Sequence, residues 1–241
     1  MQGIAPAAGR GSRLRPRTDT TPKGLVKVGD KPLLSHTFDR LIESGIDEIV
    51  VVIGYQGEQI VDHYGGQYRE ASVRYVEQSE PDGLADAVAQ TDRVLDREQD
   101  LLVVNGDNVF GAPLTPVVER HRRTAADATL VVETADRETA RQTGIVQTAD
   151  DGTVSAIVEK PADPPTELIT TGAYVLPPAI VEHCRAIEPS ERGEYELATA
   201  ITRFIAHGGV VTTARLEGWR VNVNTETDRE RAAQLLTEPP D

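Results

Sequence analysis

Five short motifs carry side chains that could bind phosphate groups, a metal ion and a sugar. The first, Gly9-Arg10-Gly11-Ser12-Arg13-Leu14, directly follows the short apolar segment Ile4-Ala5-Pro6. Glycines in such a turn let backbone N–H groups approach phosphate oxygens, because no Cβ stands in the way. The turn lacks the third glycine of a dinucleotide-binding loop, and the chain has no Gly-Lys-Ser/Thr triplet of a P-loop. The turn therefore suits a triphosphate, but it is neither a dinucleotide-binding loop nor a P-loop.

Two cations lie in and after this turn. Arg13 ends the glycine-rich segment, and Lys23 follows ten residues later in Pro22-Lys23-Gly24-Leu25. Together they could clamp a triphosphate and offset the charge that builds up in phosphoryl-type transfer. Either residue alone would be interpreted as a solvated surface charge. Lysine is scarce in this chain, however, so we interpret Lys23 as a residue kept for chemistry; the four lysines are Lys23, Lys27, Lys31 and Lys160.

The remaining motifs offer oxygen ligands and a second ion pair. Asp107, in Asn105-Gly106-Asp107-Asn108, follows a strand predicted over 101–104, at the edge where open α/β sheets bind ligands. Its carboxylate could bind a hard cation, and Asn222 could add an uncharged oxygen. Taken alone, the Asp107 segment is as readily a strand end with a turn, and the Asn222 segment is more often a plain strand and turn. Glu159-Lys160 closes a further predicted strand and offers an acid and a cation to a sugar phosphate.

The elements that must position these residues alternate between strands and helices. Residues 49–53 form a β-branched run typical of a parallel strand covered on both faces, and the pattern over 33–44 predicts a helix that ends at Gly45. We predict an α/β fold with an open, mostly parallel twisted sheet and helices on both faces, as one domain. A nucleotide-binding half would span residues 1–110, a sugar-phosphate half 111–228, and a C-terminal helix and tail 229–241, with the tail frayed from Thr237 on. Other strands are predicted over 4–6, 73–76, 101–104, 129–133, 144–148, 154–159, 169–176 and 210–216, and other helices over 56–64, 84–95, 178–186 and 195–208.

Composition narrows the classes of partner. The net charge of −14 argues against nucleic acid or an anionic membrane as a general partner. No apolar stretch approaches the ~20 residues that span a bilayer, and nothing at the N-terminus suggests export. The single cysteine, Cys184, excludes an intrachain disulfide. The sequence thus predicts a cytoplasmic protein; its acidic, lysine-poor composition favours a halophilic source over the alternative of a GC-rich genome.

In this order the motifs closely resemble those of the sugar-1-phosphate nucleotidyltransferases, especially the short glucose-1-phosphate thymidylyltransferases and uridylyltransferases. The resemblance runs from residue 2 to about 228, nearly the whole chain. It includes three segments that the chemistry alone did not single out: Gln78-Ser79-Glu80-Pro81-Asp82-Gly83-Leu84-Ala85, Thr171-Gly172-Ala173-Tyr174 and Arg192-Gly193-Glu194-Tyr195-Glu196-Leu197. The resemblance implies a Rossmann-like fold similar to that of GT-A enzymes, Mg²⁺ as cofactor, and a nucleoside triphosphate with a sugar-1-phosphate as substrates. It also allows a homo-oligomer.

The resemblance further implies a role for each matching residue. Arg13, Lys23 and Asp107 would be catalytic, with Lys23 bridging the phosphates of both substrates. Asp107 and Asn222 would hold the metal. The nucleotide would be bound by Ala8, Gly9, Gly11, Ser12, Arg13, Gln78 and Gly83, and the sugar phosphate by Gly144, Glu159, Lys160, Gly172 and Glu194.

Two positions depart from the usual pattern. Asn222 stands where thymidylyltransferases usually carry a second metal-binding aspartate, as in some uridylyltransferase relatives. Pro6 stands where a leucine is usual, and proline has no N–H to offer a base. The resemblance favours dTTP or UTP with glucose-1-phosphate as substrates. Pro6 leaves the choice between the two nucleotides open.

The predicted reaction needs no general base. A phosphate oxygen of the sugar-1-phosphate attacks the α-phosphorus in line, and pyrophosphate leaves; catalysis consists of holding two anions together and offsetting their repulsion. The non-enzyme alternative is a catalytically weak regulatory protein of the same fold that binds sugar nucleotides. An NAD-dependent oxidoreductase is disfavoured by the glycine pattern, whereas guanylyl or cytidylyl transfer differs only in the base.

Overall fold

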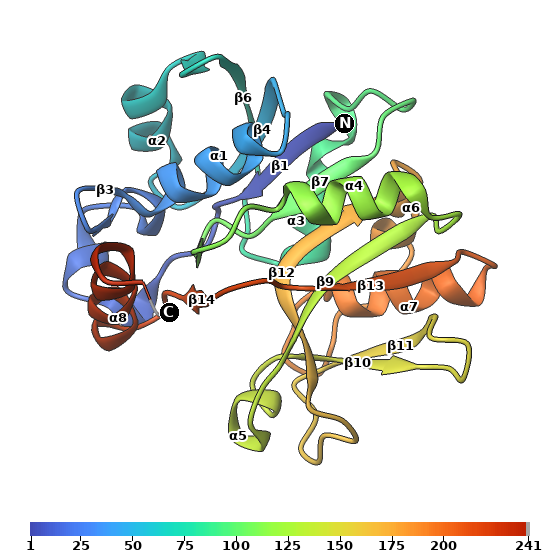
Figure 1. The fold of residues 1–241 in the computed structure, drawn as a ribbon. Coiled ribbons are helices and arrows are strands. Elements are labelled where there is room, and N and C mark those ends of the chain that lie inside the picture. Colours follow the sequence, from blue (N-terminus) through green and yellow to red (C-terminus); the bar gives the residue numbers. More distant parts are fainter. Residues whose placement is uncertain (240–241) are drawn as a thin grey trace. The chain divides into compact units, whose positions relative to one another are not determined.

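Alternating strands and helices begin at the first residues, as the sequence predicts. The computed structural model describes residues 1–239, and the chain forms two compact units that are described separately (Figure 1). The first unit contains residues 1–81, 103–115 and those from 217 on, and the second contains 82–102 and 116–216. The strand β7 (Leu101–Val104) and the helix α4 (Thr115–Arg123) cross the boundaries between these segments.

The first unit is built on parallel strands. β1 (Gln2–Pro6) pairs in parallel with β4 (Glu48–Ile53), and β4 pairs in parallel with β6 (Ala71–Glu77). The β-branched interior of β4 is fully buried, as expected of a strand covered on both faces. The two-residue strand β5 (Gln67–Tyr68) adds to β6 in antiparallel fashion.

Helices of the first unit bury the faces that their sequences predict. α1 (Leu33–Glu43) buries Leu34, Phe38 and Leu41 and ends before Gly45, whose φ of +83° favours glycine. α2 (Gly57–Tyr64) places Tyr64 against Phe38, with ring centroids 4.8 Å apart. A short hairpin, β2 (Lys27–Val28) with β3 (Lys31–Pro32), precedes α1.

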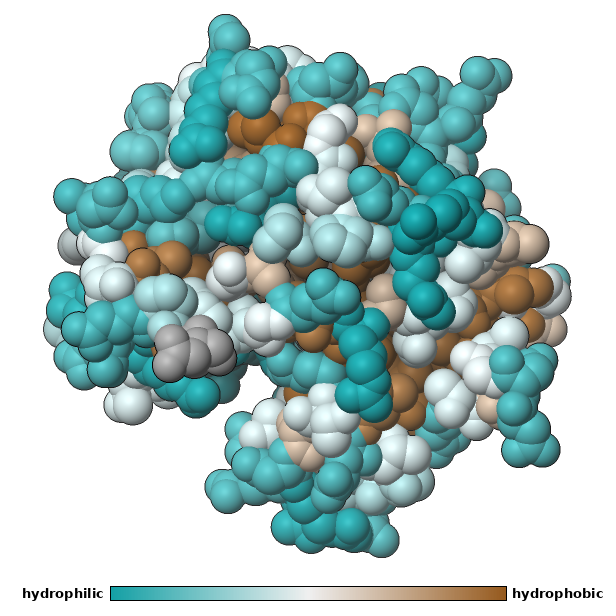
Figure 2. Space-filling model, in the orientation of Figure 1, coloured by the Kyte–Doolittle hydropathy of each residue, from teal (hydrophilic) through white to brown (hydrophobic). Residues whose placement is uncertain are grey.

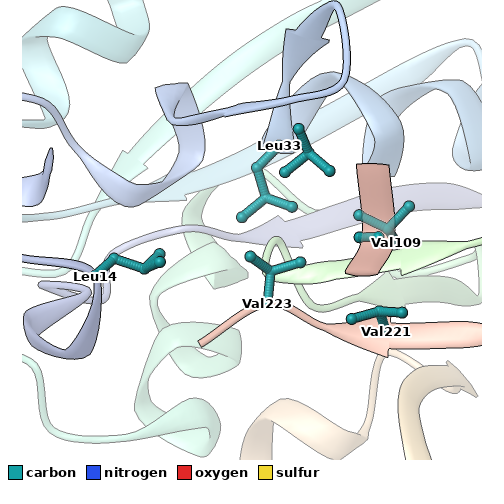
Figure 3. Close-up of a cluster of buried hydrophobic side chains, with 7 residues drawn as sticks. Leu14, Leu33, Val109, Val221 and Val223 are labelled. Atoms are coloured by element: carbon teal, nitrogen blue, oxygen red, sulfur yellow. The ribbon is translucent and has the colours of Figure 1, made fainter. Parts of the chain in front are cut away.

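A small hydrophobic core joins the chain's two ends within the first unit. β8 (Asn108–Phe110) pairs in antiparallel fashion with β14 (Arg220–Asn222), and Figure 3 shows Val109 of β8 and Val221 of β14 in one cluster with Leu14, Leu33 and Val223. The cluster excludes water beneath the glycine-rich turn and the end of β14, and so fixes both segments. Its buried members are Leu14, Val28, Leu33, Val109, Val221, Val223 and Ala232.

The C-terminal helix α8 (Glu226–Thr237) begins at a capping box. The Thr225 hydroxyl accepts from the Asp228 N–H, and the Asp228 carboxylate accepts from the Thr225 N–H. The cap explains why the helix begins three residues before the predicted residue 229. Thr237 ends the helix and does not begin a frayed tail; the last two residues of the predicted tail, Pro240 and Asp241, lie outside the described residues.

The second unit combines antiparallel and parallel pairs. β12 (Leu168–Leu176) pairs antiparallel with β9 (Ala128–Thr134) and with β10 (Gly144–Thr148), which forms a hairpin with β11 (Val154–Glu159). β13 (Val211–Arg215) lies parallel to β9. The helices α3, α6 and α7 pack on one another, and α7 also packs on β11. They span Leu84–Gln90, Ile180–Arg185 and Leu197–Ala206, and a short helix α5 spans Arg137–Ala140.

Two predicted helices are shorter than expected. The helix predicted over 84–95 ends at Gln90 and continues as a single 3₁₀ turn, because the Thr91 hydroxyl donates to the Val88 carbonyl and tightens the chain there. The helix predicted over 195–208 begins at Leu197. The backbone of Tyr195 is used elsewhere: its N–H donates to the Asp82 carbonyl and its carbonyl accepts from the Ala85 N–H.

The visible face of the protein is mostly hydrophilic, with small scattered apolar areas (Figure 2). This agrees with a chain in which 27% of the residues are charged. Within residues 1–239, every helix is too short or too polar to cross a membrane.

Candidate active site

The glycine-rich turn is folded against the lysine that follows it. Gly11 has φ +61°, a left-handed conformation, and its carbonyl accepts from the Thr18 hydroxyl at 2.8 Å. A Cβ added to Gly11 would lie 2.9 Å from the Cβ of Lys23. Gly11 is followed by a 3₁₀ turn, Ser12–Leu14, that buries Leu14 and leaves Arg13 exposed. Glycine is therefore required here both by conformation and by the close approach of Lys23.

Lys23 lies at the start of a 3₁₀ turn, Lys23–Leu25, and its side chain is only 12% exposed. Its ammonium group donates to Asp107 Oδ2 at 3.0 Å and to Asn224 Oδ1 at 2.9 Å. Three segments distant in the sequence thus meet at one cation within the first unit. This contact brings two of the predicted catalytic residues, Lys23 and Asp107, together; their catalytic roles stay a prediction.

Asn224 also joins the two predicted phosphate-binding cations. Its Oδ1 atom accepts from Arg13 Nη2 at 2.9 Å as well as from Lys23, while its Nδ2 donates to Asn222 Oδ1 at 2.8 Å. Because Arg13 Nη2 and Lys23 Nζ each lie 2.9 Å from the same oxygen, these two nitrogens are at most about 5.8 Å apart. At that distance two unit positive charges repel by at least ~3 kcal/mol at an effective dielectric near 20, and by ~0.7 kcal/mol in water. An anion placed between them would relieve this repulsion.

The pairing of β8 with β14 sets the acidic side of the site. Asn222 lies opposite Asn108 in the register, next to Asp107 in the chain, and the Val223 N–H donates to the Asp107 carbonyl at 2.8 Å. Asn108 Nδ2 donates to Asp107 Oδ1 at 3.1 Å, and Asn108 Oδ1 accepts from Arg220 at 2.8 Å. The Asp107 carboxylate is therefore oriented from both of its oxygens.

These residues fit a hard divalent cation by their donor chemistry. The Asp107 carboxylate and the Asn222 amide offer oxygen ligands, which Mg²⁺ prefers, and a magnesium ion usually completes its shell with water and substrate phosphate oxygens. Among residues 1–239, no group of three or more His, Cys, Asp or Glu side chains is placed to hold a metal ion.

A pocket in the first unit suits a nucleobase. It has a volume of about 170 Å³, and Gln78 at its wall is buried, with its N–H bonded to the Ile53 carbonyl at 2.8 Å. The Arg10 guanidinium lies over the Tyr55 ring at 5.9 Å from the centroid, on the same pocket. Predicted nucleotide residues Ala8 and Gln78 line it; the full lining is Ala8, Arg10, Gly54, Tyr55, Glu77, Gln78, Ser79 and Pro81.

Pro6 and the predicted strand that carries it are held firmly in place. The Pro6 carbonyl accepts from the Gly106 N–H at 3.0 Å, and a Cβ on Gly106 would lie 2.7 Å from that carbonyl oxygen. The glycine of Asn105-Gly106-Asp107 is thus needed for this close approach, which brings the metal motif beside β1.

The predicted sugar-phosphate residues belong to the second unit. Gly144 lies directly opposite Glu159 in the β10–β11 pair, and a Cβ on Gly144 would lie 3.0 Å from Glu159 Oε2. Lys160 has φ +46°, and its ammonium group lies 3.4 Å from Glu159 Oε1. The left-handed turn at Lys160 thus lets its side chain fold back beside the carboxylate that precedes it.

The Glu159 carboxylate has an unusual environment. Its side chain is 23% exposed, and burial raises its pKa above the usual range, an effect that Lys160 partly opposes and Glu196 reinforces. Glu196 is itself buried and accepts from Arg192 at 2.7 Å and from Ser190 at 3.2 Å. A buried carboxylate beside a lysine is suited to binding sugar hydroxyls, because water competes little for its lone pairs.

The remaining predicted residues of the second unit lie on loops and bulges. Gly83 has φ +109°, and a Cβ there would meet the Tyr195 carbonyl at 2.6 Å, so this loop packs tightly on the segment that carries Glu194. Glu194 accepts the Ser190 N–H through its carbonyl. Gly172 has φ +79° and lies where the β12–β9 register shifts between Thr170 and Tyr174.

Comparison with known proteins shows the family of this chain. The sequence profile described as "Nucleotidyl transferase" matches residues 2–220. The chain belongs to the nucleotidyl transferase family. It is 42% identical to the UTP–glucose-1-phosphate uridylyltransferase of Haloferax volcanii over 238 residues, which cover 99% of this chain and 97% of that protein. It is 33% identical to a glucose-1-phosphate thymidylyltransferase of Streptomyces griseus, with 99% of this chain covering 66% of that protein.

Solved structures of nucleotidyltransferases share the fold. A Bacillus anthracis structure assigned as a glucose-1-phosphate thymidylyltransferase superposes with a TM-score of 0.89 at 27% identity, covering 100% of this chain and 97% of that one. A UDP-glucose pyrophosphorylase complexed with UDP-glucose also gives a TM-score of 0.89; at 21% identity, covering 99% of both chains, it shows the fold alone. The predicted nucleotidyltransferase of α/β fold is confirmed, and the halophilic source is supported by the Haloferax relative. The division into functional halves near residue 110 stays a prediction.

The structure groups the predicted site residues by unit. It brings together Arg13, Lys23, Asp107 and the segment of Asn222 in the first, and Gly144, Glu159 and Lys160 in the second. Sequence reasoning missed Asn224 and the pair of Arg192 with Glu196. For Asn224 a signal existed: it lies two residues after Asn222, on the same side of an extended segment.

Proposed function

We propose that this nucleotidyl transferase joins UTP or dTTP to glucose-1-phosphate, giving a nucleotide sugar and pyrophosphate. The observation that carries the proposal is the convergence of Arg13, Lys23 and Asp107 beside the glycine-rich turn, where two cations share one neutral acceptor. The 42% identity to a UTP–glucose-1-phosphate uridylyltransferase supports UTP as the first candidate. Because nucleoside triphosphates are intracellular substrates, we place the reaction in the cytoplasm.

In the proposed reaction the first unit binds the triphosphate. Backbone N–H groups around Gly9 and Gly11 and the side chains of Arg13 and Lys23 would contact its phosphates, with Ala8, Ser12 and Gln78 completing the nucleotide site. Asp107 and Asn222 would hold Mg²⁺, which when bound supplies Lewis-acid neutralisation of phosphate charge. The Lys23 ammonium group, which donates to Asp107 in the free protein, would then donate to the phosphates instead.

The second unit would bind the sugar phosphate. Glu159 would accept hydrogen bonds from sugar hydroxyls and Lys160 would contact the phosphate, while Gly144 leaves room beside Glu159. We assign Gly83 to the base edge, and Gly172 and Glu194 to the sugar. A phosphate oxygen of the sugar-1-phosphate forms the new bond to the α-phosphorus, the bond from the α-phosphorus to the bridging oxygen breaks, and pyrophosphate takes up the electron pair. No proton transfer is needed, since the attacking oxygen is already ionised.

The test is pyrophosphate release with Mg²⁺ and glucose-1-phosphate, across UTP, dTTP, CTP, GTP and ATP, in low and high KCl. Release with UTP, dTTP or both, abolished by EDTA and restored by added Mg²⁺, is the expected result. A different base profile would correct the nucleotide, and release only with another sugar-1-phosphate would correct the sugar. Binding of nucleotide without product from any pair would overturn the enzymatic proposal and favour a regulatory binding protein.

A further inference from the structure

The neutral side chain of Asn224 occupies a place in the first unit where a carboxylate would be expected. It is the common acceptor of two cations, Arg13 and Lys23, each at 2.9 Å from its Oδ1. The chain has 39 acidic residues, and most cations around the site pair with one: Arg17 with Glu226, Arg229 with Glu226, and Lys23 itself with Asp107. At the one acceptor shared by the two phosphate-binding cations, the partner carries no charge.

The position of Asn224 is held from both its backbone and its side chain. Its N–H donates to the Asp228 carboxylate at 3.1 Å, which also accepts from Thr225 in the capping box of α8. Its Nδ2 donates to Asn222 Oδ1 at 2.8 Å. This bond turns the amide oxygen toward the cations, since only an acceptor can face two N–H donors.

We propose that Asn224 is a positioning residue whose uncharged amide oxygen keeps Arg13 and Lys23 together without cancelling their charge. An amide oxygen offers lone pairs to both donors and so orders them, and it adds no negative charge beyond that of Asp107, which already pairs with Lys23. A carboxylate at the same place would order them too, but the triphosphate would then have to displace or approach an anion. The charge matters in a protein of net charge −14, whose overall field opposes a polyanionic substrate.

The inference rests on the proposed role of Arg13 and Lys23 in binding a triphosphate. Two variants of Asn224 distinguish the proposed electrostatic role of this residue from a merely structural one. Asn224→Asp keeps the shape of the side chain and both acceptor contacts but loses the donation to Asn222, whereas Asn224→Ala removes all three bonds and adds no charge. If Asn224 only stabilised the loop, Asn224→Ala would be the more damaging change. If its neutrality is what matters, Asn224→Asp is the more damaging change for phosphate binding, while it strengthens the ion pairs of the free protein.

The experiment measures the Kd of inorganic tripolyphosphate by calorimetry, without metal and with EDTA, in low and high KCl. We expect Asn224→Asp to raise the Kd at least tenfold at low salt with a melting temperature equal to or above wild type, and Asn224→Ala to raise it less. The excess effect of Asn224→Asp should shrink at high salt, because it is electrostatic. Gln234→Glu, an exposed change on α8 in the same unit, adds the same charge and should bind as wild type.

Three outcomes would overturn the inference. Asn224→Asp binding tripolyphosphate as wild type does, or better than Asn224→Ala does, would show that the charge of this residue is immaterial. An equal loss in Gln234→Glu would assign the effect to net charge alone. Wild-type protein that does not bind tripolyphosphate would instead overturn the proposed phosphate site, and this inference with it.

Discussion

Lys23 can be tested by removing its ammonium group while keeping the rest of the first unit. In Lys23→Ala, the partners Asp107 and Asn224 keep their own hydrogen bonds to Asn108 and Asn222. Opposite unit charges about 4 Å apart attract by ~1 kcal/mol in water and ~4 kcal/mol at an effective dielectric near 20. The Lys23 side chain is 12% exposed, so the upper part of this range applies to a phosphate bound there.

We therefore expect kcat/KM of Lys23→Ala to fall by a factor of about 10²–10³, the usual effect of removing one donor that stabilises the transition state. Stability should change little. Asp107 is 32% exposed, so water can solvate it, and an ion pair of this kind contributes at most about 1 kcal/mol, or roughly 2–4 °C in Tm for a chain of this length. The variant should thus be folded and nearly inactive.

The assay is steady-state pyrophosphate release with Mg²⁺, together with a thermal melt of the same preparations. Lys27→Ala is the matched control, because it removes the same charge from an exposed lysine four residues away. Its rate should equal that of wild type. If Lys23→Ala retained more than about a tenth of wild-type kcat/KM, or if its loss of rate merely followed a large loss of Tm, the assignment of Lys23 to the phosphates would be refuted.

Three further predictions concern the neighbourhood of the site. Gly11→Ala forces a Cβ into a left-handed residue 2.9 Å from Lys23 Cβ, and should cost about 1–2 kcal/mol in unfolding free energy by chemical denaturation, with a loss of turnover. Burial raises the pKa of the Glu159 carboxyl, so above the unfolded pKa of about 4.5 the charged form destabilises the folded protein, and Glu159→Gln should raise the unfolding free energy at pH 7. The same variant should raise KM for the sugar-1-phosphate. A variant less stable at pH 7 than wild type would contradict the pKa argument. The pKa of Glu226 is lowered to about 2, first by its hydrogen bond from Arg17, so its contribution to stability is present above pH 4.5 and is lost as the pH falls toward 2. Unfolding measured from pH 6 to pH 2 should therefore show a weaker acid dependence in Glu226→Gln, and an unchanged acid dependence would refute the pairing.

The sequence predicts local elements well where one pattern decides them. The β-branched run of β4 and the apolar spacing of α1 specify a strand and a helix by periodicity alone, and both lie within a residue of their predicted limits. The limits of α3 and α7 were predicted less well, since a hydroxyl at Thr91 and the use of the Tyr195 backbone by a distant loop decide them. Such contacts leave no periodic signal.

The residues of the candidate site also differ in whether a local sequence pattern reveals them. Arg13, Lys23 and Asp107 could be found because each lies in a motif with its own chemistry. The only sequence signal for Asn224 is its spacing from Asn222, since its role depends on bonds to residues 201 and 211 positions earlier in the chain. Those bonds follow from the pairing of β14 with β8, a long-range contact that neither short strand specifies by itself.

The interleaving of the first unit has a consequence for synthesis on the ribosome. The second unit uses only residues 82–216, so all of its chain has been synthesised before β14. The first unit cannot form β14 or place Asn222 and Asn224 until residues beyond 217 emerge. Domains usually fold from the N-terminus as they are synthesised. Here the cluster around Lys23 must wait for the segment after residue 217, so a nascent chain stalled before it would carry the predicted sugar-phosphate residues but could not complete that cluster.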